Sequence, residues 1–165
     1  MAAQPPEPKM IPVLKTLLFT IFVPGTVAVY LPYRFADAPW PVQVNAWVVA
    51  GAAMFLSGGL IYLSCAWHFA WTGQGTPAPI DPPKVLIVRG LNRYVRNPMY
   101  IGVLIMVVGQ AVFFRAGHLL YYAAFVMVTV HLFVLFYEEP HLRKQFGASY
   151  EEYLQRVPRW LPKAP

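Results

Sequence analysis

Long apolar stretches alternate with polar, proline-rich or charged connections along this chain of 165 residues. Four such stretches cover about residues 13–31, 46–71, 99–114 and 119–137. An α-helix rises about 1.5 Å per residue, so roughly 20 apolar residues cross the hydrocarbon core of a bilayer, which is about 30 Å thick. The pattern predicts an all-α integral membrane protein with about four transmembrane helices, preceded by a mobile N-terminus over residues 1–12.

The first two predicted spans contain residues that shape helices and their packing. Pro24 and Gly25 stand near the middle of the first span and predict a kink there. Pro32 is expected to end that span and to open a loop that reaches Asn45. Small residues recur at helical spacing in the second span, which lets a neighbouring backbone approach closely. They are Gly51, Ala53, Ser57, Gly58 and Gly59, and Gly102 and Gly109 serve the same purpose in the third span.

After the fourth span, residues 138–165 form an amphipathic segment. Its first part is expected to continue as a helix to Phe146, with Gly147 as the C-terminal stop. Ser149 and Glu152 have the spacing of a capping box, which predicts a second short helix. The apolar side chains of this segment form a stripe made by Leu142, Phe146, Tyr150, Tyr153 and Leu154. We expect the segment to cover the cytoplasmic mouth of the helix bundle.

The longest connection runs from Thr72 to Asn97. Connections of this length are usually functional or disordered. The run from Val85 to Val88 is apolar but too short to span a bilayer, so we expect it to pack against another part of the protein.

The start of the third span is a candidate binding feature. Asn97 is a favoured N-cap residue, and Pro98 suits the first helical position because the first-turn N–H donors are unpaired anyway. With an exposed Arg96 beside it, this helix N-terminus suits an anion such as the carboxylate of a small cofactor. In a simpler interpretation, Arg89, Arg93 and Arg96 only hold the helix end at the lipid headgroups.

Composition supports a membrane protein and excludes several other classes. Hydrophobic residues make up 58% of the chain and charged residues 12%, against about 25% charged residues in soluble proteins. The net charge of +6 comes from basic residues beside the spans, where anionic lipid explains them better than nucleic acid does. Cys65 is alone, which excludes a disulfide framework and a cysteine metal site. We expect one domain over residues 1–165.

The basic residues also predict an orientation. In a four-span arrangement every Lys and Arg except Arg34 and Arg115 falls on one side of the membrane. Basic residues favour the cytoplasmic side. We therefore expect both termini to lie in the cytoplasm, at a membrane of the bacterial cytoplasmic type.

The apolar run of the fourth span ends abruptly at Glu138 and Glu139. A tight turn over residues 115–118 makes spans three and four antiparallel neighbours, so this pair lies on the same membrane face as the arginine loop. Two adjacent, partly desolvated carboxylates suit an organic cation. Alternatively, Glu139 and Arg143 form an ordinary helix-surface pair worth about 0.3–0.5 kcal/mol, whereas Glu138 has no basic residue four positions later.

The histidines and glycines indicate no competing site. His68 lies between Trp67 and Trp71, and His131 and His141 are isolated, so we expect packing or capping roles and no metal. Hydrolase arrangements, a Walker phosphate loop and a dinucleotide-binding glycine motif are all absent from the sequence.

Two spaced motifs fill much of the second half of the chain. The first is Gly90-x-x-Arg93-Tyr94-x-Arg96-Asn97-Pro98-x-Tyr100-x-Gly102. The second is Glu138-Glu139-x-x-Leu142-x-x-x-Phe146-Gly147-x-x-Tyr150-x-x-Tyr153-x-x-Arg156-Val157-Pro158-Arg159. In this order they resemble the isoprenylcysteine carboxyl methyltransferases and the related phospholipid N-methyltransferases of membranes. Asn97 stands where the isoprenylcysteine enzymes usually have His.

The resemblance implies S-adenosylmethionine as the cofactor, bound between the loop before the third span and the segment after the fourth. It implies methyl transfer to a lipophilic acceptor that arrives from the bilayer, either a prenylcysteine-like carboxylate or a lipid amine. Glu138 and Arg96 would then be catalytic. The residues that the resemblance assigns to the cofactor site are Val88, Gly90, Tyr94, Arg96, Asn97, Tyr100, Gly102, Glu138 and Glu139.

Two other functions stay open on the sequence alone. A sterol-type membrane reductase, whose C-terminal region resembles this family, would bind NADPH. A non-enzymatic small membrane protein or transporter subunit would need polar residues along a path at mid-membrane depth, and the predicted spans offer almost none.

Overall fold

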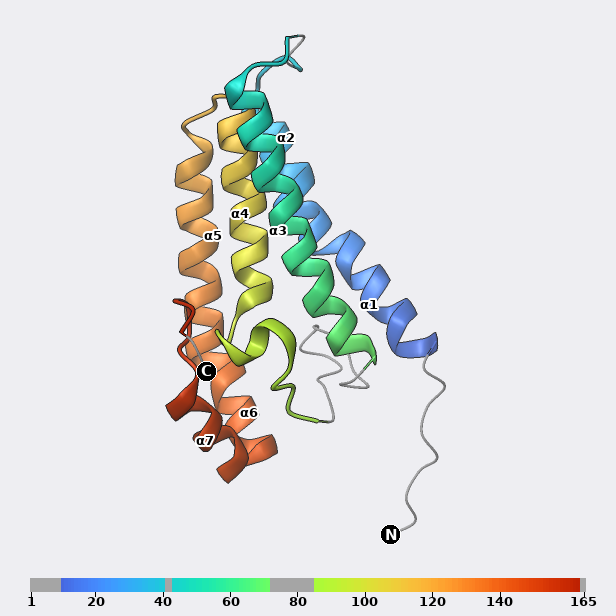
Figure 1. Cartoon of the computed structure of the whole chain (residues 1–165), viewed down its shortest axis with the longest axis vertical. Coiled ribbons are helices and arrows are strands. Elements are labelled where there is room, and N and C mark those ends of the chain that lie inside the picture. The colour runs from blue at the N-terminus through green and yellow to red at the C-terminus, as the bar shows by residue number, and fades with distance from the viewer. Residues whose placement is uncertain (1–9, 41–42, 72–84, 164–165) are drawn as a thin grey trace.

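The computed structural model describes residues 10–40, 43–71 and 85–163, and all regular structure in these ranges is helical. Long helical rods run side by side, and short helices gather at the end of the bundle where α4 begins (Figure 1). The elements in order are α1 (Met10–Phe22), η1 (Thr26–Tyr30), α2 (Leu31–Ala36), α3 (Ala46–Trp71), η2 (Gly90–Arg93), α4 (Pro98–Phe113), α5 (Leu119–Phe133), η3 (Val134–Glu138), α6 (Glu139–Phe146) and α7 (Ala148–Arg156). The predicted all-α fold is confirmed.

The protein is an integral membrane protein. Among the described residues, three helical stretches are long and apolar enough to cross a bilayer: Val13–Ala36, Ala46–Trp71 and Leu119–Phe146. The third predicted span forms the shorter, 16-residue helix α4, whose Val107 is fully buried. Because α4 packs against α3, α5 and η1, it forms the centre of the bundle.

The first helical rod, made of α1, η1 and α2, differs from the predicted first span at both ends. Residues 10–12 belong to α1, and the remainder of the N-terminus that was predicted to be mobile lies outside the described residues. The predicted irregularity near Pro24 is present, since the α-helix is interrupted at Val23 and continues through the π-helical turn η1. The expected loop at Pro32 is wrong, because helix α2 follows η1 directly at Leu31 and contains Pro32 in its first turn.

Neighbouring helices supply the donors that Pro32 lacks. Proline has no backbone N–H, so the carbonyls one helical turn before Pro32 lose their usual partner. The Gln110 side-chain amide donates to the Ala28 carbonyl oxygen at 2.6 Å, and the Tyr122 hydroxyl donates to the Val27 carbonyl oxygen at 2.9 Å. These bonds tie the first rod to α4 and α5, because a buried carbonyl in a membrane protein must find a partner inside the protein.

The predicted close-packing glycines hold α3 and α4 together. A Cβ atom on Gly58 would lie 2.5 Å from the Gly102 carbonyl oxygen, and one on Gly51 would lie 2.6 Å from the Gly109 carbonyl oxygen. Earlier residues of α3 thus meet later residues of α4, so the helices are antiparallel and in backbone contact. Gly59 faces open space, because a Cβ atom there would have no neighbour within 4 Å.

We expect Gly58→Ala to destabilise the protein by about 1–3 kcal/mol, since overpacking a tight contact forces the backbones apart. Gly59→Ala is the matched control, and its higher helix propensity should leave stability unchanged or slightly raised. Thermal unfolding of both variants in the same detergent measures the difference. Equal transition temperatures for the two variants would show that the α3–α4 contact tolerates a methyl group.

The C-terminal half ends in two short amphipathic helices. Helix α6 stops at Gly147, which has φ 54°, as predicted. The capping box is wrong, because α7 starts at Ala148 with Gly147 as its N-cap and Ser149 lies inside the helix. The predicted apolar stripe is confirmed: Tyr150, Tyr153 and Val157 form a buried cluster with Leu86, Leu142, Phe146 and Leu154 packed against it. Leu86 also confirms that the apolar run before the arginine loop packs against another segment.

Candidate functional site

A buried ion-pair network joins the start of α4 to the end of the chain. The Glu139 side chain is only 3% exposed, and its Oε1 atom accepts a hydrogen bond from Arg96 Nη1 at 2.8 Å. Arg159 donates to the same carboxylate through Nε at 2.7 Å and Nη2 at 3.0 Å. Such two-pronged arginine–carboxylate pairs are among the stronger hydrogen-bonded contacts in proteins. We call Arg96, Glu139 and Arg159 the arginine–glutamate hub.

Backbone hydrogen bonds hold the chain around the hub. We define the C-terminal strap as residues 157–163. The Arg96 N–H donates to the Pro158 carbonyl oxygen at 2.9 Å, and the Lys163 N–H donates to the Tyr94 carbonyl oxygen at 3.0 Å. The strap therefore lies along the loop that precedes α4, so residues more than sixty positions apart in the sequence form one surface.

Asn97 takes part in this arrangement, although not in the predicted role. It occupies the N-cap position of α4, and Pro98 follows in the first turn as expected, but the Asn97 side chain makes no capping hydrogen bond. Its amide instead donates to the Arg159 carbonyl oxygen at 3.1 Å. This hydrogen bond ties the start of α4 to the strap.

The environments of several charged residues near the hub differ from those expected from the sequence. Arg96 is not exposed, since its side chain is 13% accessible and pairs with Glu139. The expected Glu139–Arg143 pair is loose, at 4.0 Å, and Arg143 Nε instead donates to Glu151 at 2.9 Å. The hydrogen bond to Glu139 raises the pKa of Arg159 above its ordinary value, so this guanidinium stays charged.

Glu138 points to a different neighbour. Its Oε2 atom accepts a hydrogen bond from the Tyr100 hydroxyl at 3.0 Å, and the described residues give it no arginine or lysine partner within salt-bridge distance. The adjacent glutamates thus differ, as predicted from their 100° separation on the helix. Glu139 holds the hub together, whereas Glu138 is left for other partners.

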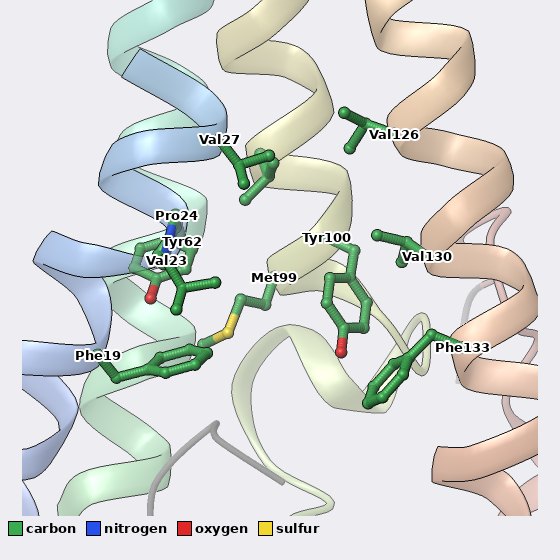
Figure 2. Close-up of a pocket in the computed structure, with 11 residues that line it drawn as sticks. Phe19, Val23, Pro24, Val27, Tyr62, Met99, Tyr100, Val126, Val130 and Phe133 are labelled. Carbon is green, nitrogen blue, oxygen red and sulfur yellow. The ribbon is translucent and has the colours of Figure 1, made fainter. Parts of the chain in front are cut away.

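Tyr100 also lines an apolar cavity of about 250 Å³ (Figure 2). The cavity lies among four rods, with walls that include Phe19 from α1, Tyr62 from α3, Met99 from α4 and Phe133 from α5. Its lining is almost wholly hydrocarbon or aromatic. The Glu138 carboxylate is therefore one hydrogen bond away from the wall of a cavity shaped for an apolar molecule.

The other predicted site residues lie around this centre. Val88 is 42% exposed and Tyr94 40% exposed, both on the loop before α4. Gly90 has φ 57°, and a Cβ atom there would lie 3.2 Å from the His68 ring, so a side chain at this position would be strained and crowded. Gly102 is buried against α3 rather than against the cavity.

Arg159 is the main residue of the site that was not predicted from the sequence. It is part of the second motif, so its spacing signal was present, but nothing in that spacing indicated that it would fold back onto Glu139. The cavity residues Phe19, Tyr62 and Phe133 gave no signal, because apolar and aromatic residues occur throughout the spans.

His131 has the packing role that was expected of it. The Trp160 indole N–H donates to His131 Nδ1 at 3.0 Å, which attaches the strap to α5. His68 is also satisfied locally, with its Nδ1 atom 2.6 Å from the Ser64 carbonyl oxygen. Among the residues described by the structure, no group of three or more His, Cys, Asp or Glu side chains is placed to hold a metal ion.

We expect Trp160→Phe to loosen the strap while keeping an aromatic ring. Losing one hydrogen bond costs about 1 kcal/mol, which corresponds to an opened population about five times larger and a similar increase in cleavage of the opened tail. Limited trypsin digestion at Arg156 and Arg159 measures this increase. Trp67→Phe is the control, because Trp67 is 57% exposed and far from the strap in sequence. Equal cleavage rates for both variants would contradict the attachment.

Comparisons with known proteins agree with this geometry. The family model described as phospholipid methyltransferase matches residues 46–149. Two curated relatives from rice, one from the indica and one from the japonica subspecies of Oryza sativa, are each named probable protein-S-isoprenylcysteine O-methyltransferase. Each is 42% identical over 79 residues, covering 47% of this chain and 40% of the relative.

A third relative is the chicken (Gallus gallus) protein named Delta(14)-sterol reductase LBR. It is 34% identical over 83 residues, which cover 48% of this chain and 13% of that protein. The chain therefore spans less than half the length of each of these relatives. No solved structure gives a significant match.

Proposed function

Because this chain belongs to the phospholipid methyltransferase family, we propose that it is an S-adenosylmethionine-dependent methyltransferase that acts on a lipophilic acceptor at the cytoplasmic face of the membrane. The observation that carries the proposal is the position of Glu138. Its carboxylate is bonded to Tyr100, which lines the apolar cavity, and lies next in sequence to the centre of the arginine–glutamate hub. An apolar cavity with a few convergent polar groups is the usual form of a small-molecule site.

The residues present fit the charges of this cofactor. Its carboxylate needs a cationic partner, and Arg96 Nε is buried with no hydrogen-bond partner among the described residues. A buried donor without a partner is costly, so an anion bound there would be favourable. The hub holds two arginines and one glutamate, which leaves a net positive charge for that anion. The amino and sulfonium groups are cationic, and Glu138 is the adjacent carboxylate, with no cationic partner in the part of the chain that the structure describes.

The cofactor would supply an electrophilic methyl group, and the protein's own residues would align and shield the reaction. Methyl transfer of this kind is an in-line displacement that depends on alignment and on exclusion of water. The strap and the loop before α4 would exclude water. Glu138 would orient a carboxylate acceptor, which is already nucleophilic, or accept a proton from an amine acceptor. Tyr100 would hold Glu138 in place through its hydroxyl.

The cavity supports a lipophilic acceptor. It is walled by apolar groups from α1, α3, α4 and α5 and is only partly enclosed. A prenyl or acyl chain would bury its hydrocarbon there, and each buried CH₂ group contributes about 0.8 kcal/mol. The reactive headgroup would then lie toward the Tyr100–Glu138 pair. The relatives' names are compatible with either a prenylcysteine or a lipid acceptor.

The proposed orientation places the hub and both termini in the cytoplasm. The helices α6 and α7 and the loop before α4 share the end of the bundle from which α1 starts (Figure 1). This end carries most of the basic residues of the chain, as expected for a cytoplasmic face. A reporter that is active only in the cytoplasm should be active when it is fused to the C-terminus, and a reporter that is active only outside should be inactive there. The opposite pattern would overturn this orientation.

Calorimetric titration of the detergent-purified protein tests the cofactor. We expect saturable binding of S-adenosylmethionine and none of NADPH, and the reverse result would favour a sterol-type reductase. Incubation of the protein with methyl-labelled S-adenosylmethionine and a total lipid extract then tests transfer. Label should appear in a lipid fraction with intact protein and not with heat-unfolded protein. Binding of neither cofactor would support a non-enzymatic protein.

A further inference from the structure

A second hollow of about 400 Å³ lies beside the first turn of α4. Its apolar walls include Ile61 from α3 and Ile101 from α4, and its rim includes Tyr94 from the loop and Lys163 from the strap. We call it the strap groove.

The strap groove is distinct from the cavity beside Tyr100. The groove uses Pro98 and Ile101 of α4, which are three residues apart and lie on one side of the helix. The cavity uses Met99, Tyr100 and Val103. The first turns of α4 therefore separate the two sites, and the two sets of lining residues have no member in common.

The groove has apolar walls and a basic rim. Among the described residues, the stretches 85–103 and 157–163 contain Arg and Lys side chains but no Asp or Glu. Arg96 and Arg159 are bound to Glu139, whereas Arg93 and Lys163 have exposed side chains. The hydrogen bond from the Lys163 N–H to the Tyr94 carbonyl brings Lys163 beside the residue that follows Arg93. The polar end of the groove is therefore positively charged.

The apolar end of the groove leads into the bilayer. Ile61 belongs to α3, which is long and apolar enough to cross the membrane, and lies about three helical turns before its end at Trp71. Gly90 of the loop lies against His68, near that same end. The groove thus extends from a basic membrane surface along two helices into the hydrocarbon region.

We propose that the strap groove binds one anionic phospholipid. An acyl chain lies against Ile61 and Ile101, and the phosphate lies near Lys163. Basic side chains at a membrane surface attract anionic headgroups more strongly than zwitterionic ones, which have no net charge. Because the rim is shared by the loop and the strap, a bound lipid joins the same two segments that the hub joins. The lipid therefore stabilises the closed position of the strap.

Native mass spectrometry tests this proposal without any activity measurement. The full chain is exchanged into detergent with dioleoyl phosphatidylglycerol or dioleoyl phosphatidylcholine, and retained lipid is counted. We expect one phosphatidylglycerol to be retained at least five times more often than phosphatidylcholine. Lys163→Gln should reduce that retention at least threefold, and Ile101→Trp should reduce it similarly by filling the groove. Retention of both lipids to the same extent would overturn the proposal.

Lys144→Gln is the matched control, since it removes one exposed positive charge from α6, outside the groove. It should retain phosphatidylglycerol as the wild type does. An equal loss in Lys144→Gln and Lys163→Gln would show that net charge alone attracts the lipid and would overturn the site. If Ile101→Trp does not fold by circular dichroism, Lys163→Gln alone decides. A second copy of the chain in place of lipid would appear as a dimer mass and would also overturn the proposal.

Discussion

Glu138→Gln is expected to reduce methyl transfer at least about tenfold, roughly 1.4 kcal/mol of transition-state stabilisation, while leaving the protein folded. The substitution keeps the size of the side chain and an oxygen that can accept from Tyr100, but removes the negative charge. Glu138 has no cationic partner within salt-bridge distance among the described residues, so its charge does not hold the fold together. Labelled methyl transfer to the lipid extract, with thermal unfolding measured in parallel, tests both parts.

Two further variants test whether the loss of turnover is specific to Glu138. Tyr100→Phe keeps the cavity wall and removes the hydroxyl that bonds Glu138, so we expect a smaller loss of turnover than for Glu138→Gln. Glu152→Gln is a control for charge at this face, because Glu152 is 61% exposed and pairs with Arg156 on the surface of α7. Near-wild-type turnover of Glu138→Gln would remove this residue from the chemistry. A loss in Glu152→Gln of the same size would assign the effect to surface charge.

Glu139→Gln is expected to have a different and structural effect, a loss of stability of about 3–5 kcal/mol. Removing the carboxylate charge leaves Arg96 and Arg159 together, largely buried and without their counter-ion. The same reasoning applies to Arg96. Because Arg96 is buried in the hub, Arg96→Ala should destabilise the protein as well as weaken cofactor binding. Thermal unfolding and proteolysis of the strap measure these losses.

Exposed ion pairs on the same short helices provide the comparison. Glu151→Gln breaks the contact with Arg143, in which both side chains are about half exposed, and should change stability by less than about 1 kcal/mol. A double-mutant cycle of Arg96→Gln with Glu139→Gln should show coupling, since each single change removes the same contact. Equal stability of Glu139→Gln and Glu151→Gln would show that the hub is not a structural centre.

The sequence by itself determined the class of protein and the positions of most helices. Apolar runs of membrane-spanning length have few structures open to them other than a helix, because every backbone polar group in lipid must be hydrogen-bonded within the protein. Glycines at helical spacing also indicated where a neighbouring backbone could approach the second and third spans, since only such residues allow backbones to touch. The tight turn between spans three and four predicted that Arg96, Glu138 and Glu139 share one membrane face, and the family match agrees with the resemblance that the two motifs suggested.

Only the tertiary structure decided how these charged residues are divided between fold and site. Helical spacing paired Glu139 with Arg143, but the folded chain brings in Arg96 from 43 positions earlier and Arg159 from 20 positions later. Local rules also predicted a loop at Pro32, whose missing donor is compensated by side chains of α4 and α5. In both cases partners distant in sequence outweigh the local preference. A buried charge or carbonyl gains more from a well-placed partner than a short segment gains from its own propensities.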